Sequence, residues 1–134
     1  MEEGQAGRPG IMSEDERSEA YALGRRGEEI ALEYLHRKGY RIEERGYRLF
    51  RGEIDIIARD GDTLVFVEVK ARATTEFGLP EEAVTPAKQA QIRKIARGFL
   101  VERKLGEPDC RFDVLAILAP IDGDPVITHY ENAF

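Results

Sequence analysis

Residues 52–71 read GEIDIIARDGDTLVFVEVKA, and this stretch decides the fold. Two runs with β-forming residues, Glu53 to Arg59 and Leu64 to Ala71, flank the segment 60–63, whose glycine suits a tight turn. Side chains alternate between the two faces of a strand, so the three valines of the second run share one face. The other face carries Phe66, Glu68 and Lys70. The stretch therefore predicts a β-hairpin with one charged face.

The register of this hairpin follows from its turn. With residues 61–62 as a two-residue loop, Asp55 lies directly opposite Glu68. The same register places Glu53 opposite Lys70. If the loop is shifted by one residue, the first two carboxylates become diagonal neighbours instead. Both registers keep all four side chains on one face.

The charged face has the composition of a metal site. Carboxylates whose Cβ atoms lie about 5 Å apart repel each other unless a positive charge lies between them, so Asp55 and Glu68 point to a divalent cation such as Mg²⁺. Lys70 projects from the same side, where its ammonium group can help an attacking water or offset charge in the transition state. Glu53 is either a further ligand or the ion-pair partner of Lys70. A solvated strand face is the alternative, but residues 65–69 are apolar enough for a central strand covered on both sides.

The flanking sequence predicts two helices. Ser13 and Glu16 match a capping box, so a first helix begins there and ends near Lys38. Glycines at 24 and 27 leave open whether it is one helix or two pieces. A capping hydroxyl and a proline at 85–86 begin a second helix, which stops before residue 106.

Three further strands complete the prediction. They are an edge strand over residues 40–50, a buried strand over 112–119 and a short last strand over 126–130. Residues 72–84 form a loop long enough to be functional or mobile. The predicted fold class is α/β, a mixed β-sheet flanked by helices in the order α-β-β-β-α-β-β.

The composition is that of one intracellular domain. The chain has 134 residues, 42% of them hydrophobic, which is enough for one core of ordinary quality. Residues 1–12 are expected to be disordered, which leaves 13–134 as a single domain. The one cysteine, Cys110, can form no internal disulfide and is expected to serve packing. The sequence shows no signal-peptide core and no membrane span, so we expect a cytoplasmic protein with no membrane partner.

The net charge of −6 argues at first against contact with phosphate backbones. Residues 1–20 hold two basic and six acidic side chains and residues 105–134 hold one and six, which leaves seventeen basic and fourteen acidic side chains between them. Several of those fourteen acids are proposed metal ligands. The charge distribution therefore permits binding to nucleic acid without indicating it.

Several motifs together resemble a known family. GEID at 52–55 followed by FVEVK at 66–70 resembles the PD-(D/E)XK nuclease superfamily, although Ile54 stands where that superfamily often has proline. With GRRGE at 24–28, RFD at 111–113 and NAF at 132–134, the chain more specifically resembles the uncharacterised YraN-type family. The resemblance implies a restriction-endonuclease-like fold, dependence on Mg²⁺ or Mn²⁺, and phosphodiester hydrolysis. Holliday-junction resolvases are the characterised relatives that this layout resembles.

The resemblance also assigns roles to residues. Asp55 is the motif aspartate, Glu68 and Lys70 are the E-x-K pair, and Glu28 matches the helix-borne acid of resolvase-like members. Glu28 lies three residues before Ala31 and should share its face toward the sheet, where it either completes the metal shell or pairs with an arginine. The expected catalytic residues are Asp55, Glu68, Lys70 and Glu28. The expected ligands of Mg²⁺ or Mn²⁺ are Asp55, Glu68, Glu28 and Glu53.

The second helix carries polar residues beside its apolar stripe. For Lys88 and Gln91, solvated helix surface is the favoured interpretation. The basic residues of this helix are compatible with phosphate contact, yet equally typical of a soluble helix. They are Arg93, Lys94, Arg97, Arg103 and Lys104. The Tyr and Phe residues fall at core spacing, so no aromatic platform for stacking bases is expected.

Three functions are compatible with these observations. The favoured one is a metal-dependent endonuclease that hydrolyses nucleic acid, expected to be DNA and including branched or structured DNA. The alternative is a nucleic-acid-binding module that keeps the fold and the metal but cleaves little. The third is a protein-interaction domain with fortuitous carboxylates. A homodimer is compatible with the sequence, and no element encodes base readout.

Overall fold

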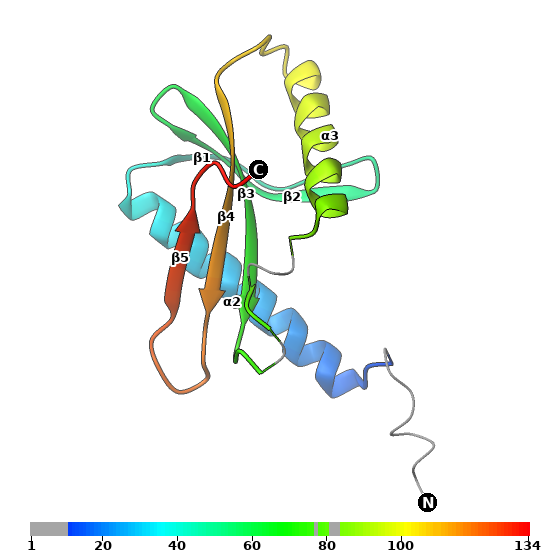
Figure 1. The fold of residues 1–134 in the computed structure, drawn as a ribbon, viewed down its shortest axis with the longest axis vertical. Helices are drawn as coiled ribbons and strands as arrows, with labels where there is room; N and C mark the ends of the chain where they lie inside the picture. Colours follow the sequence, from blue (N-terminus) through cyan, green and yellow to red (C-terminus); the bar gives the residue numbers. More distant parts are fainter. Residues whose placement is uncertain (1–10, 77, 81–83) are drawn as a thin grey trace, which may run out of the picture.

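The described residues fold into a five-stranded mixed sheet with one helix on each face (Figure 1). This computed structural model describes residues 11–76, 78–80 and 84–134. Its elements are α2 (Glu14–Arg37), β1 (Arg41–Leu49), β2 (Gly52–Asp60), β3 (Thr63–Arg72), α3 (Pro86–Glu102), β4 (Cys110–Leu118) and β5 (Val126–Tyr130). The fold class and the element order agree with the prediction.

The strands lie in the sheet in chain order, β1-β2-β3-β4-β5. All neighbouring strands are antiparallel except β3 and β4, which are parallel and are joined through α3. β3 is therefore the central strand, as its apolar sequence predicted, and β1 is an edge strand. A helical crossover is what a parallel pair requires, and it places α3 on one face of the sheet.

Helix α2 begins and ends where its sequence predicts. Ser13 is the N-cap, and its hydroxyl and the Glu16 carboxylate form both hydrogen bonds of the capping box. The helix is one continuous piece despite its two glycines. Gly27 is the one that packing requires, because a Cβ there would lie only 2.7 Å from Cβ of Ala71 on β3. This close approach brings the next residue, Glu28, beside the sheet.

Alternate residues of β3 face two separate apolar clusters. Val65 and Val67 pack toward α2, together with Ala31 and Leu35 of that helix. Leu64 and Phe66 pack toward α3. The cluster on the α3 face includes Ile92, Ile95, Ala96 and Phe99. Both faces of the central strand are thus covered, and a charged side chain on either face must find compensation locally.

Some expectations fall outside the structure or differ from it. Residues 1–10 of the expected disordered segment, and residues 77 and 81–83 of the expected loop, lie outside the described residues. Cys110, expected to serve packing, is exposed at the start of β4. Phe50, expected at core spacing, is 50% exposed. Within the described part of the chain, no helix is both long and apolar enough to cross a membrane.

Candidate metal centre

The antiparallel ladder between β2 and β3 ends at the proposed site. Its pairs run from Asp60 with Thr63 to Ile56 with Val67, which confirms the register with residues 61–62 as the loop. The next pair in this register would be Asp55 with Glu68. Here, however, a carboxylate oxygen of Asp55, Oδ2, accepts the backbone N–H of Val69 at 2.8 Å. A side chain has replaced the ladder bond, which fixes one oxygen of this carboxylate.

Strand β2 also changes face at Asp55. Ile56 packs in the α2 cluster whereas Ile54, two residues away, packs in the α3 cluster. Regular alternation would put both on one face. The facing strand β1 has Gly46 between the partners of these isoleucines, with a left-handed φ of 60° that favours glycine. The kink places Asp55 at the border of the two faces, so it can meet side chains from both helices.

Three carboxylates converge at this border. Glu28 of α2 and Glu53 and Asp55 of β2 each offer one oxygen, and these oxygens lie within 4.8 Å of one another. All three residues are partly buried. Each belongs to a different local structure, namely a helix packed through Gly27, the start of β2, and the kink. The predicted helix residue Glu28 is therefore brought to the predicted hairpin residues.

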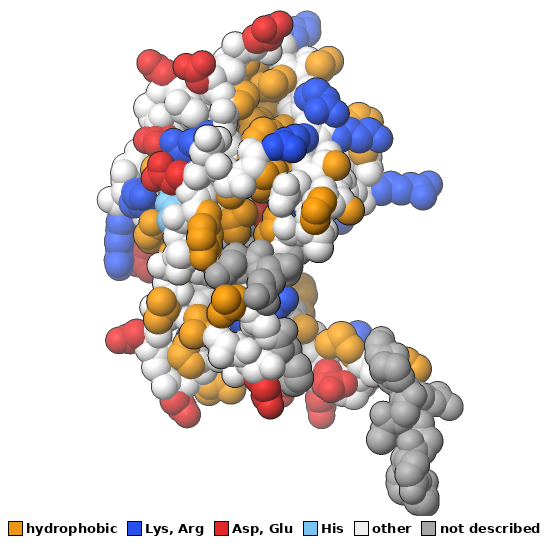
Figure 2. Space-filling model, viewed as in Figure 1, with side chains coloured by type: hydrophobic (Ala, Val, Ile, Leu, Met, Phe, Trp, Pro, Cys, Tyr) orange, Lys and Arg blue, Asp and Glu red, His pale blue; other side chains and the backbone are white. Residues whose placement is uncertain are grey.

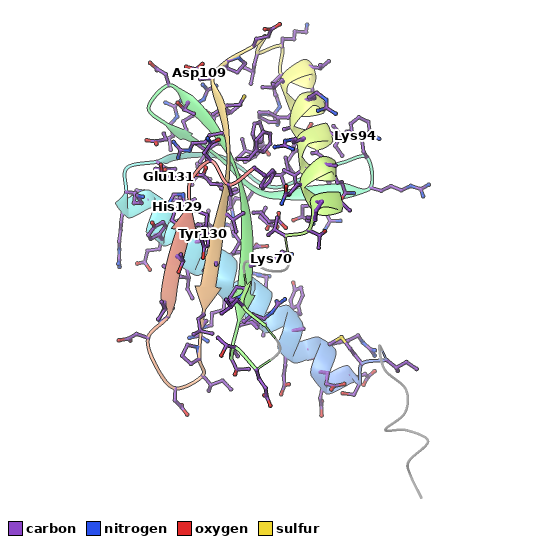
Figure 3. The ribbon with its side chains drawn as sticks, viewed as in Figure 1. Lys70, Lys94, Asp109, His129, Tyr130 and Glu131 are labelled. Carbon is purple, nitrogen blue, oxygen red and sulfur yellow. The ribbon has the colours of Figure 1, made fainter. Side chains whose placement is uncertain are left out.

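Glu68 lies beside this group, on the face of β3 toward α3. It is 3% exposed, and its Oε2 atom lies 3.4 Å from Nζ of Lys70 and 3.5 Å from Nζ of Lys88. Its other oxygen, Oε1, is buried and has no hydrogen-bond partner among the described residues. Figure 3 shows Lys70 on β3 near the beginning of α3, the helix that carries Lys88. One oxygen thus lies near two lysine ammonium groups, whereas the other accepts no hydrogen bond from them.

The Asp55 carboxyl group has an unusual proton affinity. Burial, followed by the negative charge of Glu68, raises the pKa of Asp55 to about 7, against the opposing effect of the Val69 N–H. The charge of Glu28 raises it further. Protonation of Asp55 is one means of relieving its repulsion with these carboxylates. A divalent cation is the other means of stabilising the ionised form.

The ion pairs correct two sequence interpretations. Lys70 pairs with Glu68, and Glu53 pairs with Arg48 at 3.3 Å, so the alternative that joined Glu53 to Lys70 is wrong. The second correction concerns Lys88, which was interpreted as solvated surface but contacts Glu68. The neighbouring Gln91 also packs against the start of β2, since a Cβ on Gly52 would lie 2.6 Å from its Nε2. The sequence held a signal for the contact between Lys88 and Glu68. Glu68 and Phe66 are two residues apart in β3, so both side chains face α3.

A second buried acid, Asp113, belongs to a different network. The Arg111 guanidinium contacts it at 2.9 Å, Nε2 of His129 lies 2.7 Å away, and the N–H of Asn132 donates to it. Burial opposes ionisation, yet the hydrogen bonds with His129 and Arg111 outweigh it and hold the pKa of Asp113 at about 2. Tyr40 also accepts from Arg111. The network ties β4 to β5, so Asp113 has a structural role.

The residues present fit a hard divalent cation. Their donors are carboxylate oxygens, the ligands that Mg²⁺ and Mn²⁺ prefer. The buried, unpartnered Oε1 of Glu68 and the raised pKa of Asp55 both indicate a local demand for positive charge. The ligands suited to the ion are Glu28, Glu53 and Asp55, with Glu68 adjoining them.

Comparison with known proteins gives a family without a described activity. Residues 27–117 match the family model described as "Uncharacterised protein family UPF0102". A UPF0102 protein of Chlorobium limicola is 55% identical over 119 residues, which is 85% of this chain and 92% of that protein. UPF0102 proteins of Geotalea daltonii and Geobacter sulfurreducens are 53% and 51% identical over 112 residues, 84% of this chain and 88% of each relative.

Proposed function

We propose that this protein is a metal-dependent nuclease. The premise is that the chain belongs to the uncharacterised protein family UPF0102. Its reaction is the hydrolysis of phosphodiester bonds, and its expected substrate is DNA, including branched or structured DNA. The single observation that carries the proposal is the convergence of Glu28, Glu53 and Asp55 next to a buried Glu68 that faces two lysines. The resemblance of these residues to the PD-(D/E)XK motif supports the same assignment.

A divalent cation supplies Lewis acidity when bound, which polarises the phosphodiester and makes a coordinated water more acidic. Glu28, Glu53 and Asp55 would hold it. The hydrogen bond from Val69 fixes one Asp55 oxygen and thus orients that carboxylate before any ligand arrives. Such preorganisation avoids reorienting the carboxylate during the reaction.

Lys70 is the residue that acts on the reacting groups. Its side chain is 25% exposed, so its ammonium group can reach solvent and substrate while resting 3.4 Å from Glu68. It donates hydrogen bonds to an attacking water or to a phosphate oxygen on which charge develops. Lys88 keeps Glu68 compensated from the side of α3 and is a positioning residue.

A cleavage assay tests the proposal. The full chain is incubated with branched, nicked and single-stranded DNA and with RNA, in Mg²⁺, in Mn²⁺ and in EDTA. We expect cleavage that needs the metal, is lost with Lys70→Met and is retained with Lys104→Met, which changes a lysine just beyond the C-terminal end of α3. Cleavage that survives Lys70→Met unchanged would come from a contaminant or another site and would overturn the assignment.

Calorimetry tests the metal site without reference to activity. Mn²⁺ should bind the wild type and fail to bind an Asp55→Asn, Glu68→Gln double variant, whose side chains keep their size but lose their charge. Equal binding by both proteins would show that these carboxylates hold no metal. Metal and DNA binding without cleavage would instead favour the alternative, a binding module with the nuclease fold.

A further inference from the structure

The turn between β1 and β2 has an unusual backbone. Leu49 pairs with Gly52, so Phe50 and Arg51 are the two loop residues, with φ angles of 53° and 60°. Both lie in the left-handed region, where a two-residue hairpin turn favours Asn-Gly. A phenylalanine and an arginine are strained there. Strain of this kind is retained most often where the side chains have a task.

Helix α3 packs against this turn. Gly98 is the point of contact, because a Cβ there would collide with the Leu49 side chain and lie 3.1 Å from Cε2 of Phe50. Nζ of Lys94 lies 4.8 Å from the centre of the Phe50 ring, and residues of the turn and of α3 together line an open hollow of about 560 Å³. The ring is therefore held in place by packing while half of its surface remains in solvent.

The surroundings of Phe50 are basic in a protein of net negative charge. Arg51, Lys94 and Arg97 are exposed around the turn, and Arg48 is exposed while it pairs with Glu53 of the metal centre. Glu102 is the acid that lines the hollow, and it accepts a hydrogen bond from Tyr47. Figure 2 shows Lys and Arg side chains gathered over α3, and Figure 3 shows Lys94 standing out from the side of α3.

We propose that the Phe50-Arg51 turn binds nucleic acid through an unpaired base. Phe50 stacks on the base, and Arg51, Lys94 and Arg97 contact the phosphates on either side of it. An exposed ring needs a free base face, which single strands and branch points offer and an uninterrupted duplex does not. The inference rests on the proposed function and names its substrate class as nucleic acid with unstacked bases.

The distance along β2 links the turn to the metal centre. Phe50 precedes Asp55 by five residues, so at about 3.4 Å per residue the two lie at most about 17 Å apart along the strand. A stacked strand advances about 3.4 Å per nucleotide and an unstacked strand advances further, so this length spans about five nucleotides at most. The stacked base should therefore lie within about five nucleotides of the bond that is cleaved.

Binding is measured by fluorescence anisotropy with the full chain in EDTA, so that no cleavage occurs. The probes are a labelled single strand, a splayed-arm DNA and a blunt duplex of equal length. Phe50→Ala should weaken binding to the first two about tenfold and to the duplex less than twofold. Phe50→Trp, which keeps an aromatic ring, should bind the single strand and the splayed-arm DNA as tightly as the wild type. Tyr21→Ala, which removes an exposed aromatic ring from α2, should leave all three affinities unchanged.

A second variant separates folding from binding. Asn tolerates left-handed φ, so Phe50→Asn should raise the melting temperature yet bind single strands as weakly as Phe50→Ala. Unchanged affinity in both Phe50 variants would overturn the inference, and so would an equal loss on duplex and single strand. Because no metal is present, these results do not depend on cleavage. If the cleavage assay fails but binding depends on Phe50, the proposed nuclease activity is refuted and the proposed base binding is not.

Discussion

Lys88, in the first turn of α3, places its Nζ 3.5 Å from Oε2 of Glu68 on β3. The same oxygen also contacts Lys70. This relationship crosses from the helix to the central strand and gives a buried carboxylate two cationic partners. One of them can therefore be removed without leaving Glu68 uncompensated.

Lys70→Met should separate catalysis from stability. Because Lys88 remains, we expect a loss of at most about 1 kcal/mol of unfolding free energy but about a hundredfold loss of turnover. Urea midpoints and cleavage rates of the same preparation are the measurement. The Lys70→Met, Lys88→Met double variant should lose about 3 kcal/mol or more, since it strands a buried charge. A large loss in the single variant, with activity proportional to the folded fraction, would make Lys70 structural.

The raised pKa of Asp55 predicts an unusual pH dependence of stability without metal. Its pKa is about 7 when folded and near 4 when unfolded, so the folded state binds the extra proton between these values. The stabilisation is complete below pH 4 and is lost as the pH rises through 7. In EDTA, the difference in unfolding free energy between wild type and Asp55→Asn should change by about 2 kcal/mol or more over this range. A difference independent of pH would contradict the shift, and saturating Mn²⁺ should abolish the loss at high pH.

The lowered pKa of Asp113 predicts a pH dependence of stability that is opposite in sign to that of Asp55. Its pKa is held at about 2 when folded, below its unfolded value, so its contribution is present above pH 4 and is lost as the pH falls through 2. Asp113→Asn should cost about 3 kcal/mol at pH 7, because it leaves Arg111 and His129 without their buried partner. Denaturant unfolding at several pH values measures this. Mn²⁺ affinity should be unchanged, whereas a parallel loss of metal binding would link the two networks.

The two glycines of α2 offer a matched pair of Gly→Ala substitutions, one in open space and one at a packing contact. Gly24→Ala meets no atom within 4 Å and should stabilise the protein by about 1 kcal/mol through helix propensity. Gly27→Ala must push the helix away from Ala71 and should destabilise by about 1 to 3 kcal/mol. It should also weaken Mn²⁺ binding, because Glu28 moves with the helix. Equal melting temperatures for the two variants would show that α2 is not seated through Gly27.

Local chemistry was sufficient to predict the helices and strands and the carboxylates that converge in the candidate metal centre. The capping box at Ser13, the Thr85-Pro86 start and the turn at 61–62 act within a few residues, so the sequence displays them directly. The kink at Asp55 was not predictable, because alternation was assumed to continue along β2. Gly46, with its left-handed φ, lies opposite Asp55 in the facing strand, a juxtaposition that is known only when the register of β1 is known.

Lys88 and Phe50 illustrate a second limit. Each was interpreted from its own segment, as helix surface and as core. The environment of each is set by a distant segment, namely Glu68 for Lys88 and α3 for Phe50. Sequence spacing describes which face a residue occupies, but it does not describe what is packed against that face.

The order of the strands has a consequence for folding kinetics. Because β1, β2 and β3 form a meander of sequence neighbours, they can pair through short loops before the slower, non-local docking of α3 and β4. The meander carries Glu53, Asp55 and Glu68, whereas Lys88 arrives only with α3. During folding, the carboxylates of the meander therefore come together before Lys88, one of their positively charged partners, is in place. Refolding followed by stopped-flow should accelerate with millimolar Mg²⁺ more than with NaCl of equal ionic strength, and an Asp55→Asn variant should refold at a rate independent of Mg²⁺.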